Sequence, residues 1–117
     1  MALVTSHTLN GVDGSHAGGI RVQLIATTPG AVPLFDTEMD AGGRLSQTVS
    51  PGLIDPDTSY DLVFFVGGYW KARMPDADMK HINDQIVIRF SMPDTEGHYH
   101  MPVILNPHAY SVWMSGE

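Results

Sequence analysis

The sequence predicts an all-β fold, a sandwich of two antiparallel sheets with about eight strands and one short helix. Short β-favouring segments, in which apolar and polar residues alternate, recur along the chain as half-buried strands do. Glycine, asparagine, aspartate and proline separate these segments at the spacing expected of a sandwich. At 117 residues the chain has the common size of a single domain, so one domain is expected over residues 1–117.

The expected strands differ in how their apolar residues are spaced. Segments 20–26 and 85–92 carry an apolar side chain at every second position, so one face of each is predicted to lie in the core. Segment 60–66 is apolar on both faces, which is typical of a central strand covered on each side. The remaining strand candidates are 2–9, 32–38, 44–49, 99–105 and 110–114.

One helix is expected, at residues 69–74. It should end after a turn or two, because Pro75 and the acidic Asp76 and Asp78 follow it directly. Residues 74–84 have no strand-like pattern and are expected to form the longest loop of the domain.

Charge and composition argue against several classes of function. The net charge of -7 disfavours a nucleic-acid binder, which needs a basic surface to meet phosphate. No run approaches the ~18 apolar residues of a membrane-spanning helix, so no membrane partner is expected. No cysteine is present to form a disulfide or a thiolate metal site. The N-terminus has no basic region followed by an apolar stretch, which predicts a cytoplasmic protein.

Six histidines are more than the core of so short a chain requires. His98 and His100 are separated by one residue, so on a strand both side chains leave the same face. Two imidazoles on one face can act as a general base, a proton shuttle or a pair of metal ligands. From spacing alone, the commoner outcome is a pair of exposed polar residues on an edge strand. His7, on the first expected strand, is open to the same interpretations.

Arg44 follows two glycines and is expected to project from the start of a strand. Its guanidinium presents a fork of donors that suits an anionic or carbonyl-rich ligand, although a solvated surface arginine is the simpler interpretation. The remaining histidines, His16, His81 and His108, lie near glycine, aspartate or proline and are expected in loops without a defined role.

A zinc site is a minor alternative for the histidines. Imidazole suits zinc, and His7, His98 and His100 are conceivable ligands. A single His-x-His pair is nevertheless a weak signal, so no metal ion and no other cofactor is expected. The glycines do not form a nucleotide-binding loop between a strand and a helix.

Five motifs follow one another along the chain, at residues 5–10, 17–22, 40–44, 60–70 and 98–107. Residues 5–10 resemble Ser-Thr-His-Val-Leu-Asp, and residues 17–22 resemble Ala-Ala-Gly-Val-x-Val. Residues 40–44 resemble Thr-Asp-x-Asp-Gly-Arg, and residues 60–70 resemble Tyr-x-Leu-x-Phe…Gly-Ala-Tyr-Phe. Residues 98–107 resemble His-Tyr-His-Val-Pro-Leu-Leu-Leu-Ser-Pro. These are motifs of the 5-hydroxyisourate hydrolases, which belong to the transthyretin-like proteins. The last motif, His-Tyr-His-Met-Pro-Val-Ile-Leu-Asn-Pro in this chain, is the most specific. The resemblance covers nearly the whole chain.

The resemblance implies a transthyretin-like homotetramer, a dimer of dimers, with small-molecule sites in a channel between the dimers. It implies that His7, Arg44 and His100 line the channel as the catalytic group, and that His98 contacts the substrate near the mouth. The composition also favours association, because only 16% of the residues are charged and the centres of oligomer interfaces are depleted of charge.

The C-terminal tail departs from the family pattern. The family ends in Tyr-Ser-Thr-Tyr-Arg-Gly-Ser, whose last four residues reach into the site, whereas this chain ends in Tyr-Ser-Val-Trp-Met-Ser-Gly-Glu. Trp113 stands where the tyrosine would be and Met114 where the arginine would be. Ser115 and the following glycine invert the Gly-Ser order, and Glu117 adds one residue. Trp113, Met114 and Ser115 are therefore expected to contact a substrate that the altered tail helps to select.

The resemblance implies a hydrolase that opens a cyclic amide ring, 5-hydroxyisourate in urate degradation. His100 or His7 would be the general base, Arg44 would stabilise the oxyanion, and Trp113 would offer a flat surface for stacking. The altered tail keeps two alternatives open. One is a hydrolase for a different small cyclic ligand, and the other is a binding protein on the same fold. The joint presence of the two histidines and the arginine favours a hydrolase over a carrier.

Overall fold

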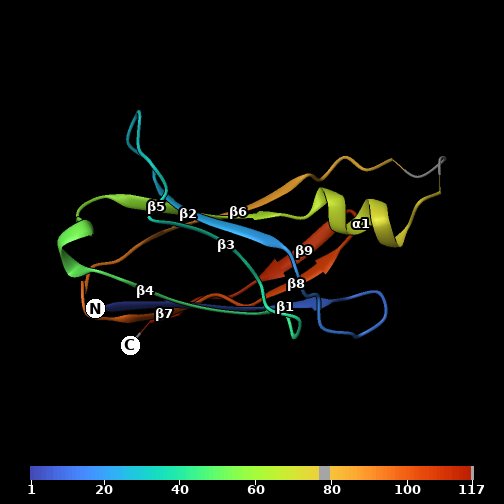
Figure 1. Cartoon of the computed structure of the whole chain (residues 1–117), viewed down its shortest axis with the longest axis horizontal. Coiled ribbons are helices and arrows are strands. Elements are labelled where there is room, and N and C mark those ends of the chain that lie inside the picture. The colour runs from blue at the N-terminus through green and yellow to red at the C-terminus, as the bar shows by residue number, and fades with distance from the viewer. Residues whose placement is uncertain (77–79, 117) are drawn as a thin grey trace.

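The structure is a computed structural model that describes residues 1–76 and 80–116. In this part of the chain two β-sheets lie face to face as two layers, with one α-helix at one end of the molecule (Figure 1). The predicted all-β sandwich with a short helix is confirmed.

The smaller sheet is antiparallel, with strand order β3-β2-β5-β6. Its strands are β2 (Arg21–Ala26), β3 (Phe35–Glu38), β5 (Ser59–Phe65) and β6 (Gln85–Ser91). The alternation predicted for β2 is confirmed, because Val22 and Leu24 are fully buried while Arg21 is exposed. The predicted central strand is β5, which pairs with β2 on one side and β6 on the other.

The larger sheet is built around β1 (Ala2–Asn10). On one side β1 pairs antiparallel with β4 (Arg44–Val49). On the other side it pairs in parallel with β7 (His98–His100) and β8 (Val103–Asn106). Two further antiparallel strands complete this sheet: β9 (Ala109–Val112) pairs with β8, and β10 (Ser115–Gly116) pairs with β7.

The strand predicted at 99–105 is divided into β7 and β8 at Pro102. The register against β1 is the same before and after the break, since Thr5 lies opposite His100 and Thr8 opposite Val103. Pro102 has no N–H to donate to the neighbouring strand, which explains the interruption. With this division and with β10, the described residues contain ten strands rather than about eight.

Two short helices connect strands. The helix α1 (Gly67–Arg73) begins before the predicted segment 69–74 and packs Trp70, only 2% exposed, against the core. A single 3₁₀ turn, η1 (Pro51–Leu53), was not predicted and follows β4. Of the predicted loop 74–84, residues 77–79 lie outside the described residues. No helix in the described part of the chain is long and apolar enough to cross a membrane.

The hydrophobic core fills the space between the two sheets, and β1 shows how it positions the site. Every second residue of β1, from Ala2 to Asn10, is buried against the other sheet. The intervening residues, among them Thr5 and His7, are half-buried on the outer face of the larger sheet. Because side chains alternate between the faces of a strand, packing of the core determines which residues point outward.

Candidate active site

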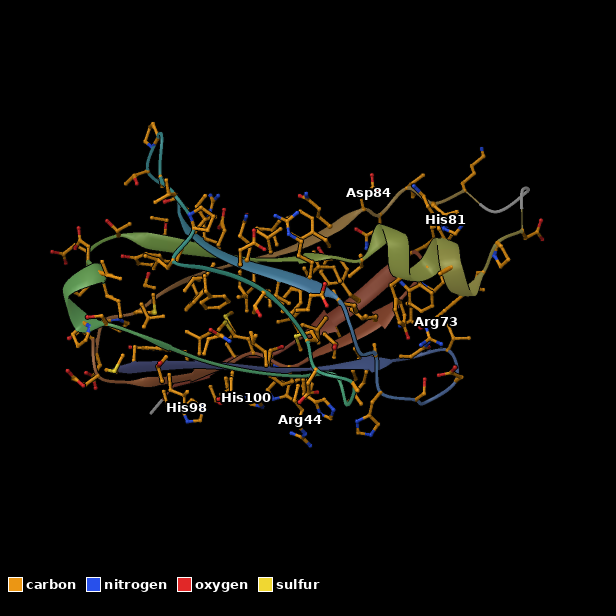
Figure 2. All side chains as sticks on the ribbon, in the orientation of Figure 1. Arg44, Arg73, His81, Asp84, His98 and His100 are labelled. Atoms are coloured by element: carbon orange, nitrogen blue, oxygen red, sulfur yellow. The ribbon has the colours of Figure 1, made fainter. Side chains whose placement is uncertain are left out.

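Three adjacent strands of the larger sheet bring the sequence-predicted polar residues together. In the pairing of β1 with β4, His7 lies directly opposite Arg44. In the pairing of β1 with β7, Thr5 lies opposite His100 and Leu3 opposite His98. Figure 2 shows Arg44, His98 and His100 pointing outward from this sheet, away from the smaller sheet.

A tight turn before β4 determines where Arg44 begins its strand. The Asp40 carboxylate Oδ1 accepts hydrogen bonds from the backbone N–H groups of Gly42 and Arg44, each at 2.9 Å. Gly43 has a positive φ of 73°, and a Cβ at this position would lie 2.5 Å from the Thr8 carbonyl oxygen. Glycine is therefore required there for both conformation and space. The turn therefore places Arg44 at the start of β4, opposite His7 on β1.

An open cavity of about 360 Å³ lies on this outer face. Its lining comes from β1, β4 and β7 and consists of Thr5, Ser6, Arg44, Leu45, Ser46, His98 and His100. This size suits a small ligand. Within the described residues Arg44 forms no ion pair, whereas Arg21 and Arg89 pair with aspartates on the smaller sheet. The Arg44 guanidinium is therefore available to a ligand oxygen.

Thr5 joins the two histidines of β7. Its Oγ1 lies 2.8 Å from Nε2 of His98 and 2.7 Å from Nδ1 of His100. A hydroxyl has one hydrogen and two lone pairs, so Thr5 donates to at most one of the rings and accepts from at least one of them. Thr5 therefore links the orientations of the two imidazoles. Sequence reasoning missed Thr5, although its position two residues before His7 indicated that it shares the outer face.

His7 belongs to a second cluster beside the cavity and is not among the residues that line it. Its Nε2 lies 2.9 Å from Nδ1 of His16, and the ring centroids are 4.8 Å apart. Partial burial, followed by the positive charge of Arg44 and by His16, lowers the pKa of His7 from its ordinary value of 6.5. A hydrogen bond to the Gly42 carbonyl opposes this shift. The lowered pKa keeps His7 neutral at neutral pH.

The tail residues are divided between two places. Ser115 lies opposite His100 in the β10–β7 pairing. Met114 lines a separate, mostly apolar cavity of about 240 Å³ together with Phe90 and Tyr99, and Ser115 also contributes to this lining. Trp113 is 52% exposed and lines neither of these cavities. In the single chain, the structure thus brings one of the three predicted tail contacts to the cavity's imidazoles.

His81 and His108, which the sequence placed in loops, do not line the cavity. His81 lies at the far end of the molecule from His98 and His100 (Figure 2), and Nε2 of His108 lies 2.5 Å from the Lys80 carbonyl. In the part of the chain that the structure describes, no three His, Asp or Glu side chains are grouped so as to hold a metal ion. His98 and His100 are instead joined by the Thr5 hydroxyl.

The two-layer sandwich of this chain is the fold of the transthyretin-like proteins. The structure of 5-hydroxyisourate hydrolase from Klebsiella pneumoniae superposes with a TM-score of 0.72 over 98% of this chain and 99% of that chain, at 24% identity. (S)-allantoin synthase superposes with a TM-score of 0.77 and 22% identity over 97% of this chain but only 43% of its own chain. At these identities the likeness concerns the fold.

The chain belongs to the HIUase/Transthyretin family, whose model matches residues 4–114. It is similar to the 5-hydroxyisourate hydrolase of Deinococcus radiodurans, with 33% identity over 94% of this chain and 92% of the relative. It is also similar to the 5-hydroxyisourate hydrolase of Pseudomonas aeruginosa, with 31% identity over 97% of this chain and 90% of the relative. The family resemblance seen in the sequence motifs is confirmed.

Proposed function

We propose that this protein is a hydrolase that opens the cyclic amide ring of 5-hydroxyisourate. The observation that carries the proposal is the Arg44 guanidinium, which forms no ion pair within residues 1–76 and 80–116, shares a small cavity with His98 and His100 and lies opposite His7, whose pKa is lowered. The names of the relatives from Deinococcus radiodurans and Pseudomonas aeruginosa support the same substrate.

Hydrolysis at this site requires a base, a water molecule and a cation. An imidazole, that of His100 or His7, takes a proton from water as the water oxygen attacks a ring carbonyl carbon. The carbonyl oxygen becomes an oxyanion, which Arg44 stabilises by charge-assisted hydrogen bonds. The ring C–N bond then breaks, and the imidazolium returns its proton to the departing nitrogen. No cofactor takes part in this sequence of steps.

His100 has the better position of the two imidazoles for the base, because it lines the cavity and Thr5 couples it to His98. His98 then contacts the substrate from the same strand. His7, neutral beside Arg44, orients the substrate or the attacking water by a hydrogen bond that carries no competing positive charge.

Assembly as a homotetramer, a dimer of dimers, completes the proposed site. The outer face of the larger sheet carries the cavity together with half-buried apolar residues such as Leu3 and Leu9. Covering this face with a second copy would exclude water from an open cavity and strengthen its electrostatic interactions. The predicted cytoplasmic location remains part of this proposal.

A second candidate is hydrolysis of a different small cyclic ligand. The altered tail favours it, because Met114 lies in the apolar cavity with Tyr99 and the tail offers no guanidinium to a urate-derived ring. A binding protein is the weaker alternative, since carriage alone does not require an arginine in one cavity with two imidazoles.

Rapid mixing with freshly generated 5-hydroxyisourate, followed by ultraviolet absorbance, tests the proposal. Decay of the substrate should be faster with the protein than without it, and the rate should be proportional to the protein concentration. Decay at the rate of the protein-free control would contradict the proposal and favour the second candidate.

A further inference from the structure

The loop after β1 places another histidine, His16, beside His7. This loop turns back along β1: Ser15 accepts a hydrogen bond from the Asn10 N–H at 2.8 Å, and Ala17 donates its N–H to the Thr8 carbonyl at 2.9 Å. His16 lies between these two anchor points and forms an isolated antiparallel bridge with Leu9. Because paired residues share a face, His16 lies on the same outer face as Leu9 and His7.

The contact between the two rings is a hydrogen bond that can hold only one proton. His7 Nε2 and His16 Nδ1 are 2.9 Å apart, so one nitrogen donates and the other accepts. If both rings were cations, two N–H groups would point at one another. The Gly42 carbonyl oxygen lies 3.1 Å from His16 Nδ1 and can only accept a hydrogen bond, so it favours a proton on that nitrogen. The neighbouring His16 therefore opposes protonation of His7.

Three charged or titratable groups act on His7, and each comes from a different element. Arg44 on β4, His16 in the loop and His100 on β7 all lower the pKa of His7. Arg44 and His100 belong to the proposed catalytic group, whereas His16 does not line the cavity. Its exposed side chain also contributes nothing to the hydrophobic core.

We propose that His16 is a positioning residue, which holds the His7 imidazole in one orientation and in its neutral state through the Nδ1–Nε2 hydrogen bond. Because Nε2 of His7 is engaged by His16, the Nδ1 side of the ring is left for the substrate or water. The inference rests on the proposed function and deepens it, since it adds a residue that acts on the reaction through His7.

Two substitutions separate orientation from charge. His16→Phe keeps a flat ring of similar size but removes the hydrogen bond and the titrating group. His16→Asn keeps a polar atom close to the place of Nδ1 but does not titrate. His108→Phe is the matched control, because His108 is also an exposed loop histidine but lies away from the cavity.

In His16→Phe, kcat should fall roughly tenfold, the most that one neutral hydrogen bond provides, with little change in KM. In His16→Asn most of kcat should return. In both variants the acid limb of the kcat/KM profile should move to higher pH, because the competing charge of His16 is gone. His108→Phe should match the unmodified protein in all three quantities.

Titration of the imidazoles by NMR provides a readout that does not depend on turnover. The pKa of His7 should rise towards 6.5 in His16→Phe and stay low in His108→Phe. An unchanged His7 titration, or an unchanged kcat in an active protein, would overturn the role of His16. If the unmodified protein does not hydrolyse 5-hydroxyisourate but the His7 pKa still moves, the proposed function fails and the contact between the rings stands.

Discussion

Ser115 lies directly opposite His100 in the antiparallel pairing of β10 with β7. Residues paired in this way place their side chains on the same face, so the tail brings a hydroxyl to the side of the imidazole. The preceding residue, Met114, is directed to the apolar cavity beside Tyr99. The tail therefore reaches His100 through the pairing of Ser115, while Met114, Ser115 and Gly116 together line the neighbouring apolar cavity.

The protein should be a tetramer in solution, because assembly covers the outer face on which the cavity lies. Light scattering should give about four times the 12.7 kDa mass of one chain. A stable monomer would remove the channel and leave the cavity open to water, which contradicts the proposed site.

His100→Asn should abolish measurable turnover but leave the melting temperature nearly unchanged. The side chain is half-buried on the outer face, so its loss removes the proposed base without opening the core. His108→Asn, at an exposed loop position, is the control and should retain full activity. A large fall in melting temperature with activity intact would instead assign His100 a structural role.

Arg44→Gln should lower kcat by roughly 10²–10³, the usual cost of losing an oxyanion donor. Arg89→Gln is the matched control, because Arg89 is also an exposed strand arginine but is paired with Asp61 on the smaller sheet. Both rates are measured with the same substrate assay. An unaltered rate in Arg44→Gln would exclude Arg44 from the mechanism.

The lowered pKa of His7 predicts how stability depends on pH. Between the ordinary value of 6.5 and the lowered value, the unfolded chain binds a proton that the folded protein does not. Stability should therefore fall as the pH decreases through this window. Urea unfolding of the protein and of His7→Asn at several pH values isolates this contribution, since the other histidines are common to both. Equal pH dependence in the two proteins would show that His7 titrates normally.

Much of the fold follows from local patterns. The bounds of β4, Arg44–Val49, agree with the predicted segment because two glycines precede it and Pro51 follows it closely. The inward positions of β2 and β6 follow from alternation, which packing against the opposite sheet enforces. The strand β10 could not be predicted in this way. Two residues carry no periodic signal, and their pairing depends on β7 being in place.

The site shows the same division between local and long-range information. The common face of His98 and His100 follows from their spacing on one strand. The position of Thr5 between them depends on a strand register that joins residues 95 positions apart, which no local pattern reveals. His16 was expected as a loop residue without a role, and it lies in a loop. Its contact with His7 depends on how that loop turns back along β1.

The last prediction concerns residues 113–117, where this chain differs most from its family. If Met114 replaces an arginine that grips the ring, binding of 5-hydroxyisourate should be weaker than in a relative that has the arginine. A charge-assisted hydrogen bond is worth about 1.5–3 kcal/mol, or one to two orders of magnitude in affinity. KM and, by a competitive analogue, Kd should be compared with those of a 5-hydroxyisourate hydrolase whose chain ends in Tyr-Arg-Gly-Ser.

Met114→Arg alone should not restore this affinity. With the present backbone, the side chain at position 114, where Met114 is 58% exposed, lines the open apolar cavity with Phe90 and Tyr99, on the side of β7 away from His100. An arginine at this exposed position would therefore be directed away from the imidazoles and should add little to substrate binding.

Replacing residues 113–117 by Tyr-Arg-Gly-Ser should raise affinity and activity towards 5-hydroxyisourate by about one to two orders of magnitude. Glycine in place of Ser115 frees the backbone opposite His100, so that the new arginine can turn towards the imidazoles. If the tail was instead reshaped for another ring, the same variant should act on 5-hydroxyisourate and lose its activity on the native substrate. If the unmodified protein already matches a 5-hydroxyisourate hydrolase that ends in Tyr-Arg-Gly-Ser in kcat/KM, neither account holds, and the altered tail is a variation without effect on substrate choice.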